Sequence, residues 1–259
     1  MDIFIVLLVG FLLGVCLLLF MYKEAFSNRV IYHHLTFTSF PKSFGKLNLF
    51  FISDIHRRRI SGKIIEQVQG KVDLVIIGGD ITEKGVPMER VKNNLLQLKK
   101  LGKVLFVWGN NDYEVDVPRL ESLFLSLEIE VLVNRSISFE SRQGERFFIL
   151  GVDDLSTNQA DIDQALMKTD HNCFKILVSH NPEISRKLRS DHGISLMLSG
   201  HTHGGQIHLL GFSPYEKGKL ITEHERTILI SNGYGTTGVP LRLGAKAETH
   251  LLTIEHGRN

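Results

Sequence analysis

The chain opens with a long apolar run and then alternates short apolar runs with amphipathic stretches. Residues 3–22 carry no charge and number about 20, a length that spans roughly 30 Å of hydrocarbon as a helix. Asp2 stands before the run where a signal peptide would have basic residues, and no A-x-A-like cleavage site follows it. The pattern therefore favours an uncleaved membrane anchor over a signal peptide. A buried hairpin helix of a soluble protein is the alternative, and the length disfavours it.

The charges beside this run predict its orientation. Lys23 and Arg29 follow the run, whereas its N-terminal side offers only the α-amine and Asp2. The positive-inside rule then places the rest of the chain in the cytoplasm, on a single-pass protein of the cell (inner) membrane. We divide the chain into an anchor (1–24), a connecting segment (25–46) and a domain (47–259). β-branched and aromatic residues in the connecting segment predict an edge strand before Pro41.

The domain reads as an α/β fold. Apolar runs that are typical of buried strands alternate first with helical patterns, and further along the chain strands follow one another more directly. The predicted strands are 47–52, 74–77, 104–108, 129–139, 147–152, 174–179, 194–198, 228–230 and 249–254. The predicted helices are 61–70, 87–102, one that begins at Pro118, 161–167, and one that runs from Pro182 through Arg189.

Composition limits the classes of binding partner and the types of metal ligand that we expect. A chain of 259 residues with 43% hydrophobic residues can bury a sizeable core, and a net charge of +2 gives no default expectation of nucleic-acid binding. Cys16 and Cys173 are far apart in sequence, which argues against a disulfide framework or a zinc finger. Any metal must therefore be held by nitrogen and oxygen.

Histidines and carboxylates collect at one kind of position, directly after apolar strands. Because the carboxyl ends of strands in an open α/β sheet form one ligand crevice, we expect these side chains to converge. Four ligands satisfy one tetrahedral ion, so the set is large enough for two ions that share a carboxylate. Imidazole and oxygen without thiolate suit Mn, Fe or Zn. The candidate ligands are Asp54, His56, Asp80, Asn110, His180, His201 and His203.

Five short blocks of sequence carry a resemblance to a known family. Asp54-x-His56, Gly79-Asp80, Gly109-Asn110-x-Asp112, a later His180 and Gly200-His201-x-His203 resemble, in order, the motif blocks of the calcineurin-like metallophosphoesterases, here of a bacterial membrane-anchored type. The resemblance runs from about Leu47 to the C-terminus. It implies a four-layer α-β-β-α sandwich of two mixed sheets.

The same resemblance implies a role for each ligand. Asp54, His56 and His203 would bind one ion; Asn110, His180 and His201 would bind the other; and Asp80 would bridge them. The implied activity is a metal-dependent phosphoesterase, in which a metal-bridging hydroxide attacks phosphorus in a phosphomonoester, a phosphodiester or a phosphoanhydride. The anchor suggests a site near the membrane surface and a substrate that could be lipid-linked. For Asp54 and Asp80 alone, capping of the next helix is the competing interpretation.

Residues beside the ligand blocks are the candidates for substrate contacts and proton donation. Arg57 and Arg58 follow the first block directly and could hold a substrate phosphate, although the sequence slightly favours a solvated basic face. Asn111 and Asp112 complete the third block as candidate catalytic residues. Family members often carry a His, thought to protonate the leaving group, where this chain has Asn111, and an amide cannot act as an acid near neutral pH. This departure leaves a second reading, an interaction module that keeps the fold but has weakened catalysis. Oligomeric state is open.

Overall fold

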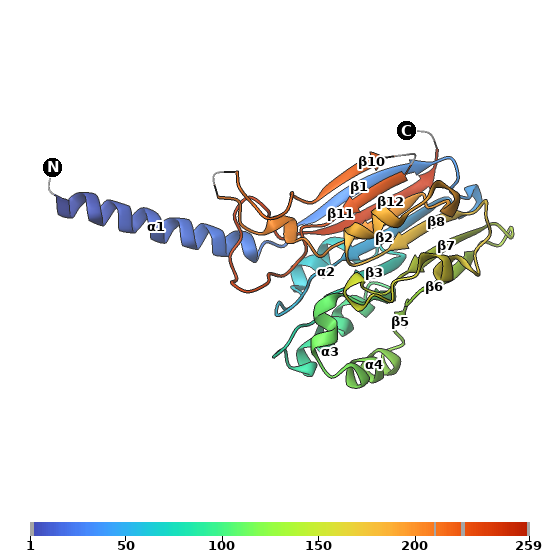
Figure 1. Ribbon diagram of the computed structural model, residues 1–259, viewed down its shortest axis with the longest axis horizontal. Coiled ribbons are helices and arrows are strands. Elements are labelled where there is room, and N and C mark those ends of the chain that lie inside the picture. Colours follow the sequence, from blue (N-terminus) through green and yellow to red (C-terminus); the bar gives the residue numbers. More distant parts are fainter. Residues whose placement is uncertain (1–2, 210, 224–225, 258–259) are drawn as a thin grey trace.

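The computed structural model describes residues 3–209, 211–223 and 226–257. One long helix, α1 (Ile3–Ala25), leaves a two-sheet domain and projects away from it (Figure 1). The apolar side chains of α1 are exposed over most of its length, and the helix is long and apolar enough to cross a membrane. This agrees with the predicted anchor.

The first sheet is mixed and has six strands. All neighbouring strands are parallel except β12 and β2, which are antiparallel. In spatial order the strands are β1 (Val30–Phe37), β12 (Thr249–His256), β2 (Lys46–Ile52), β3 (Leu74–Gly78), β4 (Lys103–Val107) and β5 (Glu130–Val131). The predicted edge strand of the connecting segment is confirmed as β1. The segment between anchor and domain thus contributes a strand to the sheet, and the boundary at residue 47 stays a prediction.

The second sheet is also mixed and has six strands. Its outer pairs, β10 with β11 and β6 with β7, are antiparallel, and its central pairs are parallel. The order is β10 (Lys219–Glu223), β11 (Arg226–Ile230), β9 (Leu196–Ser199), β8 (Phe174–Val178), β7 (Arg146–Gly151) and β6 (Arg135–Glu140). The two sheets confirm the predicted four-layer architecture.

Alternate side chains along each strand pack against different layers of the domain. On β2, Leu49 and Phe51 face the second sheet, while Phe50 and Ile52 face the helices on the outside of the first sheet. Because successive strand residues point to opposite faces, a strand buried on both sides reads as a continuous apolar run. The outer layers are formed by α2 (Gly62–Val68), α3 (Met88–Lys99) and α4 (Val117–Ser126) over the first sheet and α5 (Ile162–Leu166) over the second.

Two predicted elements differ from the structure, and one strand was not predicted. The single strand expected over 129–139 is split into β5 and β6, because the chain crosses from the first sheet to the second around Asn134, whose φ is +49°. The helix expected after Pro182 is a 3₁₀ helix. β10 was not predicted, because its residues are largely exposed and give no apolar run. The 3₁₀ helices are η1 (Lys42–Phe44), η2 (Asn110–Glu114), η3 (Leu155–Thr157), η4 (Pro182–Lys187), η5 (Ser190–His192) and η6 (His203–Gly205).

Candidate metal centre

Five strand ends bring the seven predicted ligands to one place between the sheets. The loops after β2, β3 and β4 carry those from the first sheet, and the loops after β8 and β9 carry those from the second. The first sheet supplies Asp54, His56, Asp80 and Asn110, and the second supplies His180, His201 and His203. The convergence of these side chains expected at the carboxyl ends of the strands is therefore present.

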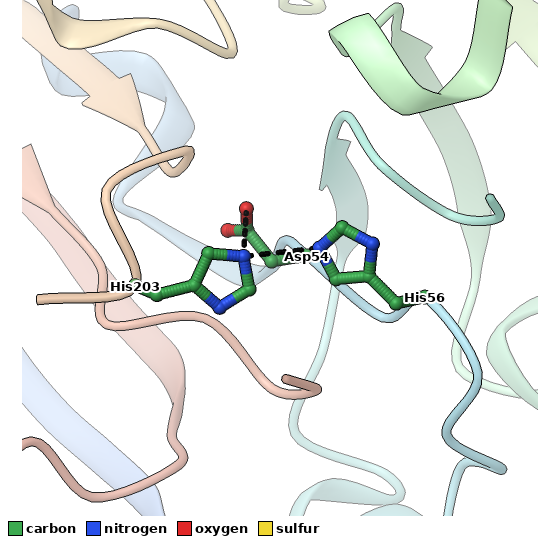
Figure 2. Close-up of side chains that lie close together, drawn as sticks. All are labelled: Asp54, His56 and His203. Atoms are coloured by element: carbon green, nitrogen blue, oxygen red, sulfur yellow. Dashed lines mark hydrogen bonds and ion pairs between the residues drawn. The ribbon is translucent and has the colours of Figure 1, made fainter. Parts of the chain in front are cut away.

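One half of the centre is built from Asp54, His56 and His203 (Figure 2). Nε2 of His56 lies 3.0 Å from Nε2 of His203, and Nε2 of His203 lies 3.4 Å from Oδ1 of Asp54. Oδ2 of Asp80 completes this half at 3.7 Å from Nε2 of His56. His56, Asp54 and Asp80 are almost fully buried.

The other half uses the same oxygen of Asp80. Oδ2 of Asp80 lies 3.2 Å from Nε2 of His180, and Nε2 of His180 lies 3.1 Å from Nδ1 of His201. Nδ1 of His201 is 3.0 Å from Oδ1 of Asn110. Because Oδ2 of Asp80 faces an imidazole of each half, this carboxylate has the position that a bridging ligand needs.

The spacing of these atoms fits the ligands of a metal ion. With metal–nitrogen bonds of about 2.0–2.1 Å, neighbouring ligand atoms lie about 3.3 Å apart in a tetrahedral shell and about 2.9 Å apart in an octahedral one. The separations here run from 3.0 to 3.7 Å. Seven donors of imidazole, carboxylate and amide type, directed at each other in two overlapping groups, therefore suit two ions of the Mn, Fe or Zn type.

Backbone conformation is strained at these positions. Left-handed φ values, between 50° and 71°, occur at Asp54, His56, Asp80, His201 and His203. Such values are uncommon for residues with a Cβ and persist where the surroundings enforce them, often at functional sites. Gly79, with φ of 83°, and Gly200 allow the loops to approach closely. A Cβ on them would lie 2.6 Å from Nδ1 of His180 and 2.4 Å from Oδ2 of Asp54.

A second set of groups fixes the imidazole rings. Oε2 of Glu83 lies 3.0 Å from Nδ1 of His56, and Arg57 holds Glu83 from the other side. The carbonyl of Gly78 accepts from Nδ1 of His180 at 2.9 Å. Carboxylates and carbonyls in this position fix the tautomer and orientation of a metal-binding His. Sequence reasoning missed Glu83, whose only signal is its position three residues after Asp80.

Electrostatics in the centre favour cations. Burial alone would disfavour a charged His180, but the carboxylate of Asp80 outweighs it and raises the pKa of His180 to about 10. For His56, burial is likewise outweighed by Glu83, Asp80 and Asp54, and its pKa is raised. His203 is the opposite case, because burial and the neighbouring His56 and Arg242 lower its pKa well below the usual value. The buried carboxylates thus hold positive charge in their midst, the charge that metal ions would supply.

Asp112 and Asn111 lie beside the centre and contact its backbone. Asp112 is fully buried, and its carboxylate accepts from the backbone N–H groups of Asp80 at 2.7 Å, Gly109 at 2.9 Å and Thr82 at 3.1 Å. Burial and the charge of Asp80 raise the pKa of Asp112 to about 8. These contacts make Asp112 a positioning residue for the two loops.

Asn111 is half-buried. Its backbone N–H donates to Oδ1 of Asp80 at 2.8 Å, and its side-chain amide donates to Glu114 at 3.0 Å.

The arginines differ from expectation. Arg58 is buried, and its guanidinium donates to the carbonyls of Ala25 at 3.2 Å, Tyr234 at 2.6 Å and Ser27 at 2.9 Å. With these partners it ties the end of α1 to the domain, a placement that does not support the predicted contact with substrate. Arg57 is mostly exposed and pairs with Glu83. Arg242, for which the sequence more weakly suggested the same phosphate contact, is fully buried beside His203.

Comparison with known proteins gives the centre its context. The model of the calcineurin-like phosphoesterase family matches residues 47–205. The uncharacterized protein YpbG of Bacillus subtilis is 46% identical over 228 residues, which are 86% of this chain and 88% of that protein. The phosphodiesterase YaeI of Escherichia coli is 28% identical over 246 residues, 87% of each chain.

A solved structure confirms the architecture. The 5'-nucleotidase precursor of Thermus thermophilus superposes with a TM-score of 0.52 at 15% identity, over 80% of this chain and 55% of that one. At that identity the likeness concerns the fold alone. The match to the family model covers more than half of the chain, and it includes all five blocks that converge on the centre. The chain belongs to the calcineurin-like phosphoesterase family.

Proposed function

We propose that this chain is a two-metal phosphoesterase that hydrolyses a phosphate ester at the centre described above. The observation that carries the proposal is the convergence of seven donor side chains from five loops, with Oδ2 of Asp80 facing both halves. Asp54, His56 and His203 would hold one ion, and Asn110, His180 and His201 the other. Two bound ions would supply Lewis acidity at the phosphoryl oxygens and activate the attacking water.

The residues around the ligands set the geometry. Glu83 keeps the proton of His56 on Nδ1, so that Nε2 is free to bind. The carbonyl of Gly78 does the same for His180. Asp112 fixes the loop that carries Asp80 against the loop that carries Asn110, because its one carboxylate accepts N–H groups from both. Ligands held in this way need little rearrangement to bind, which favours a preorganised site.

The third block limits the leaving groups that the site can handle. Asn111 is an amide and cannot donate a proton to a departing oxygen near neutral pH. The leaving oxygen must therefore depart with most of its negative charge, which suits phosphoanhydrides and aryl esters better than alkyl esters. The name of the E. coli relative favours a diester among the candidate substrates.

Membrane attachment is part of the proposal. The α1 helix would anchor the chain in the cell membrane with the domain on the cytoplasmic side, as Lys23 and Arg29 predict. Tethering raises the concentration of enzyme near membrane substrates, so a lipid-linked phosphate is the attractive choice. A C-terminal reporter fusion tests the orientation. We expect it to resist external protease in intact bacterial cells, and cleavage without permeabilisation would reverse the assignment.

A hydrolysis screen tests the activity. The full chain in detergent, loaded in turn with Mn, Fe or Zn, is assayed on aryl monoesters, aryl diesters and a phosphoanhydride. We expect turnover with at least one class and its loss in Asp80→Ala, with Asp73→Ala, a carboxylate outside the centre, as the matched control. Metal binding without hydrolysis of any ester would instead support the interaction module.

A further inference from the structure

We propose that two loops beside the anchor form a membrane-contact surface that inserts into the lipid–water interface of the bilayer that α1 crosses. The anchor-side loops are residues 206–215, described apart from residue 210, and residues 236–243. Their exposed apolar side chains, Leu209, Phe212 and Val239, are the inserting groups. The inference rests on α1 being a membrane anchor, which belongs to the proposed function, but not on the hydrolytic activity.

The end of α1 is fixed to the domain by several contacts. The backbone N–H of Arg242 donates to the carbonyl of Met21 at 3.1 Å, and Lys246 pairs with Glu24 at 3.2 Å. Met21, Glu24 and Ala25 are buried, in contrast to the exposed side chains earlier in the helix. The domain therefore has a set orientation on its anchor, and the side of the domain next to α1 faces the bilayer.

The charge pattern of α1 gives the depth of the contact. The run from Ile3 to Tyr22 is uncharged, and Lys23 is the first charge after it. Tyr22 is 52% exposed, and tyrosine favours the boundary between hydrocarbon and water. The carbonyl of Met21 therefore lies at this boundary. Since Arg242 bonds to that carbonyl, the loop that holds Arg242 lies at the same depth.

The second loop is joined to the first. The backbone of Leu243 donates to the carbonyl of Gln206 at 2.9 Å, and that of His208 donates to the carbonyl of Leu243 at 2.8 Å. Beyond this pairing Leu209 and Phe212 exchange two backbone hydrogen bonds, of 3.0 and 2.9 Å. In Figure 1 both loops extend from the domain toward the side on which α1 leaves it.

The exposed apolar residues of the membrane-contact surface are grouped in two joined loops. Phe212 is 82% exposed, Leu209 64% and Val239 53%, and all three lie in the two joined loops. Single exposed apolar residues are common on soluble proteins, and Leu125 in α4 is such a case at 81%. Exposed apolar residues that gather beside a membrane anchor lose unfavourable contact with water when they enter the interface. The partner that covers this surface is the bilayer, because α1 crosses the bilayer and holds the two loops next to it.

The membrane-contact surface also determines where the metal centre lies relative to the bilayer. The backbone of Arg242 lies at the membrane boundary, and the side chain of the same residue reaches Nδ1 of His203 at 3.2 Å. One arginine side chain therefore separates the bilayer from a ligand of the centre. A phosphate in a lipid headgroup is the substrate class that this placement fits.

Fluorescence quenching in vesicles tests the surface without reference to activity. The full chain is reconstituted in vesicles whose lipids carry bromine on the upper acyl chain, and Phe212→Trp serves as reporter. Leu125→Trp is the matched control, and wild type gives the background of the buried Trp108. For a side chain that enters the headgroup–acyl boundary, we expect the brominated lipids to lower emission from Phe212→Trp well beyond the wild-type background. Emission from Leu125→Trp should change no more than the background.

Equal quenching of the two reporters would overturn the proposal. Leu209→Trp is a second reporter, used where Phe212→Trp does not fold.

A second measurement addresses the substrate class. Phe212→Ser should lower turnover of a headgroup phosphate in vesicles and leave turnover of a soluble aryl phosphate unchanged, whereas Leu125→Ser should alter neither. An equal loss on both substrates would contradict a role in reaching the lipid. If wild type hydrolyses neither substrate, the proposed function fails, and the quenching result still decides the membrane-contact surface.

Discussion

Nη2 of Arg242 lies 3.2 Å from Nδ1 of His203, so a buried guanidinium faces the far side of a candidate metal ligand. A guanidinium can only donate, which makes Nδ1 the acceptor and leaves the proton of His203 on Nε2. Nε2 is the atom that faces His56 and Asp54 in the centre. A metal ion held by Nε2 would require that proton to move to Nδ1, and the guanidinium of Arg242 would then have to shift away from Nδ1.

Arg242 should also be a main support of the fold around the centre. Its guanidinium donates to the carbonyls of Asn232 at 2.6 Å, Gly235 at 2.7 Å and Ala245 at 2.9 Å. Arg242→Gln would leave buried carbonyls without donors, and we expect the free energy of unfolding to fall by about 2–5 kcal/mol. Denaturant unfolding in detergent measures it. Arg119→Gln, on the exposed side of α4, is the control, and an equal small effect in both would contradict this role.

Glu83 should control metal affinity through His56. Glu83→Gln keeps the size of the side chain but removes the charge that holds the imidazole proton on Nδ1. We expect a loss of roughly 10- to 100-fold in metal affinity, the usual effect of removing the hydrogen-bond partner of a ligating His. Titration with a competing chelator measures it. Glu66→Gln, exposed on α2, should bind metal as wild type does; a Glu83→Gln protein of unchanged affinity would remove Glu83 from the site.

Asn111 should make the reaction sensitive to the leaving group. General acid catalysis is typically worth about 10²- to 10⁴-fold, and its absence should be visible with poor leaving groups. Over a series of aryl phosphates, log kcat/KM should fall steeply as the leaving-group pKa rises. Asn111→His should flatten the slope by helping the poorest leaving groups most.

The slope reports this only where chemistry limits the rate. A shallow wild-type slope with a solvent isotope effect would mean that another residue donates the proton. His208, whose Nε2 lies 2.7 Å from the carbonyl of Gly204, would be the first residue to mutate.

The convergence of the candidate ligands was predictable because each follows a strand directly. A run such as Leu74–Gly78 is apolar at every position, and the first polar residues after it fall at the sheet edge, where ligands gather. The roles of Arg58 and Arg242 were not predictable. Their partners are carbonyls of distant loops and of α1, and such contacts depend on tertiary packing that no local pattern records.

β10 and Glu83 were missed for related reasons. β10 is an edge strand with four of its five residues exposed. Buried and exposed positions therefore do not alternate along it, and the usual strand pattern is missing. Nothing in the local sequence distinguishes Glu83 from the other Asp and Glu residues of the chain. Only its contact with His56, from another loop, makes it part of the centre. A pattern along one segment predicts that segment's own structure, and it does not predict which distant segment will contact it.

Acid should destabilise the fold through His250, outside the centre. Burial, His33 and Arg29 lower the pKa of His250 to about 3. The pKa of a histidine in an unfolded chain is about 6.5. Below that pH the unfolded state binds a proton at His250, whereas the folded state does not. Stability from this residue is therefore complete above about pH 6.5 and is lost as pH falls, by up to about 1.4 kcal/mol per pH unit.

Unfolding of the full chain between about pH 7 and 5 measures this loss. His250→Gln should flatten the dependence, while His34→Gln, at an exposed position, should leave it as in wild type. An unchanged slope in His250→Gln would assign the acid sensitivity to other groups.

The metal content of the purified chain tests the central claim most directly. After loading with Mn, Fe or Zn and removal of free metal, elemental analysis should find two ions per chain. Asp80→Ala should lose both, because the same carboxylate oxygen faces both halves of the centre. A wild-type chain that saturates at one ion, or an Asp80→Ala chain that still holds two, would contradict the two-metal account.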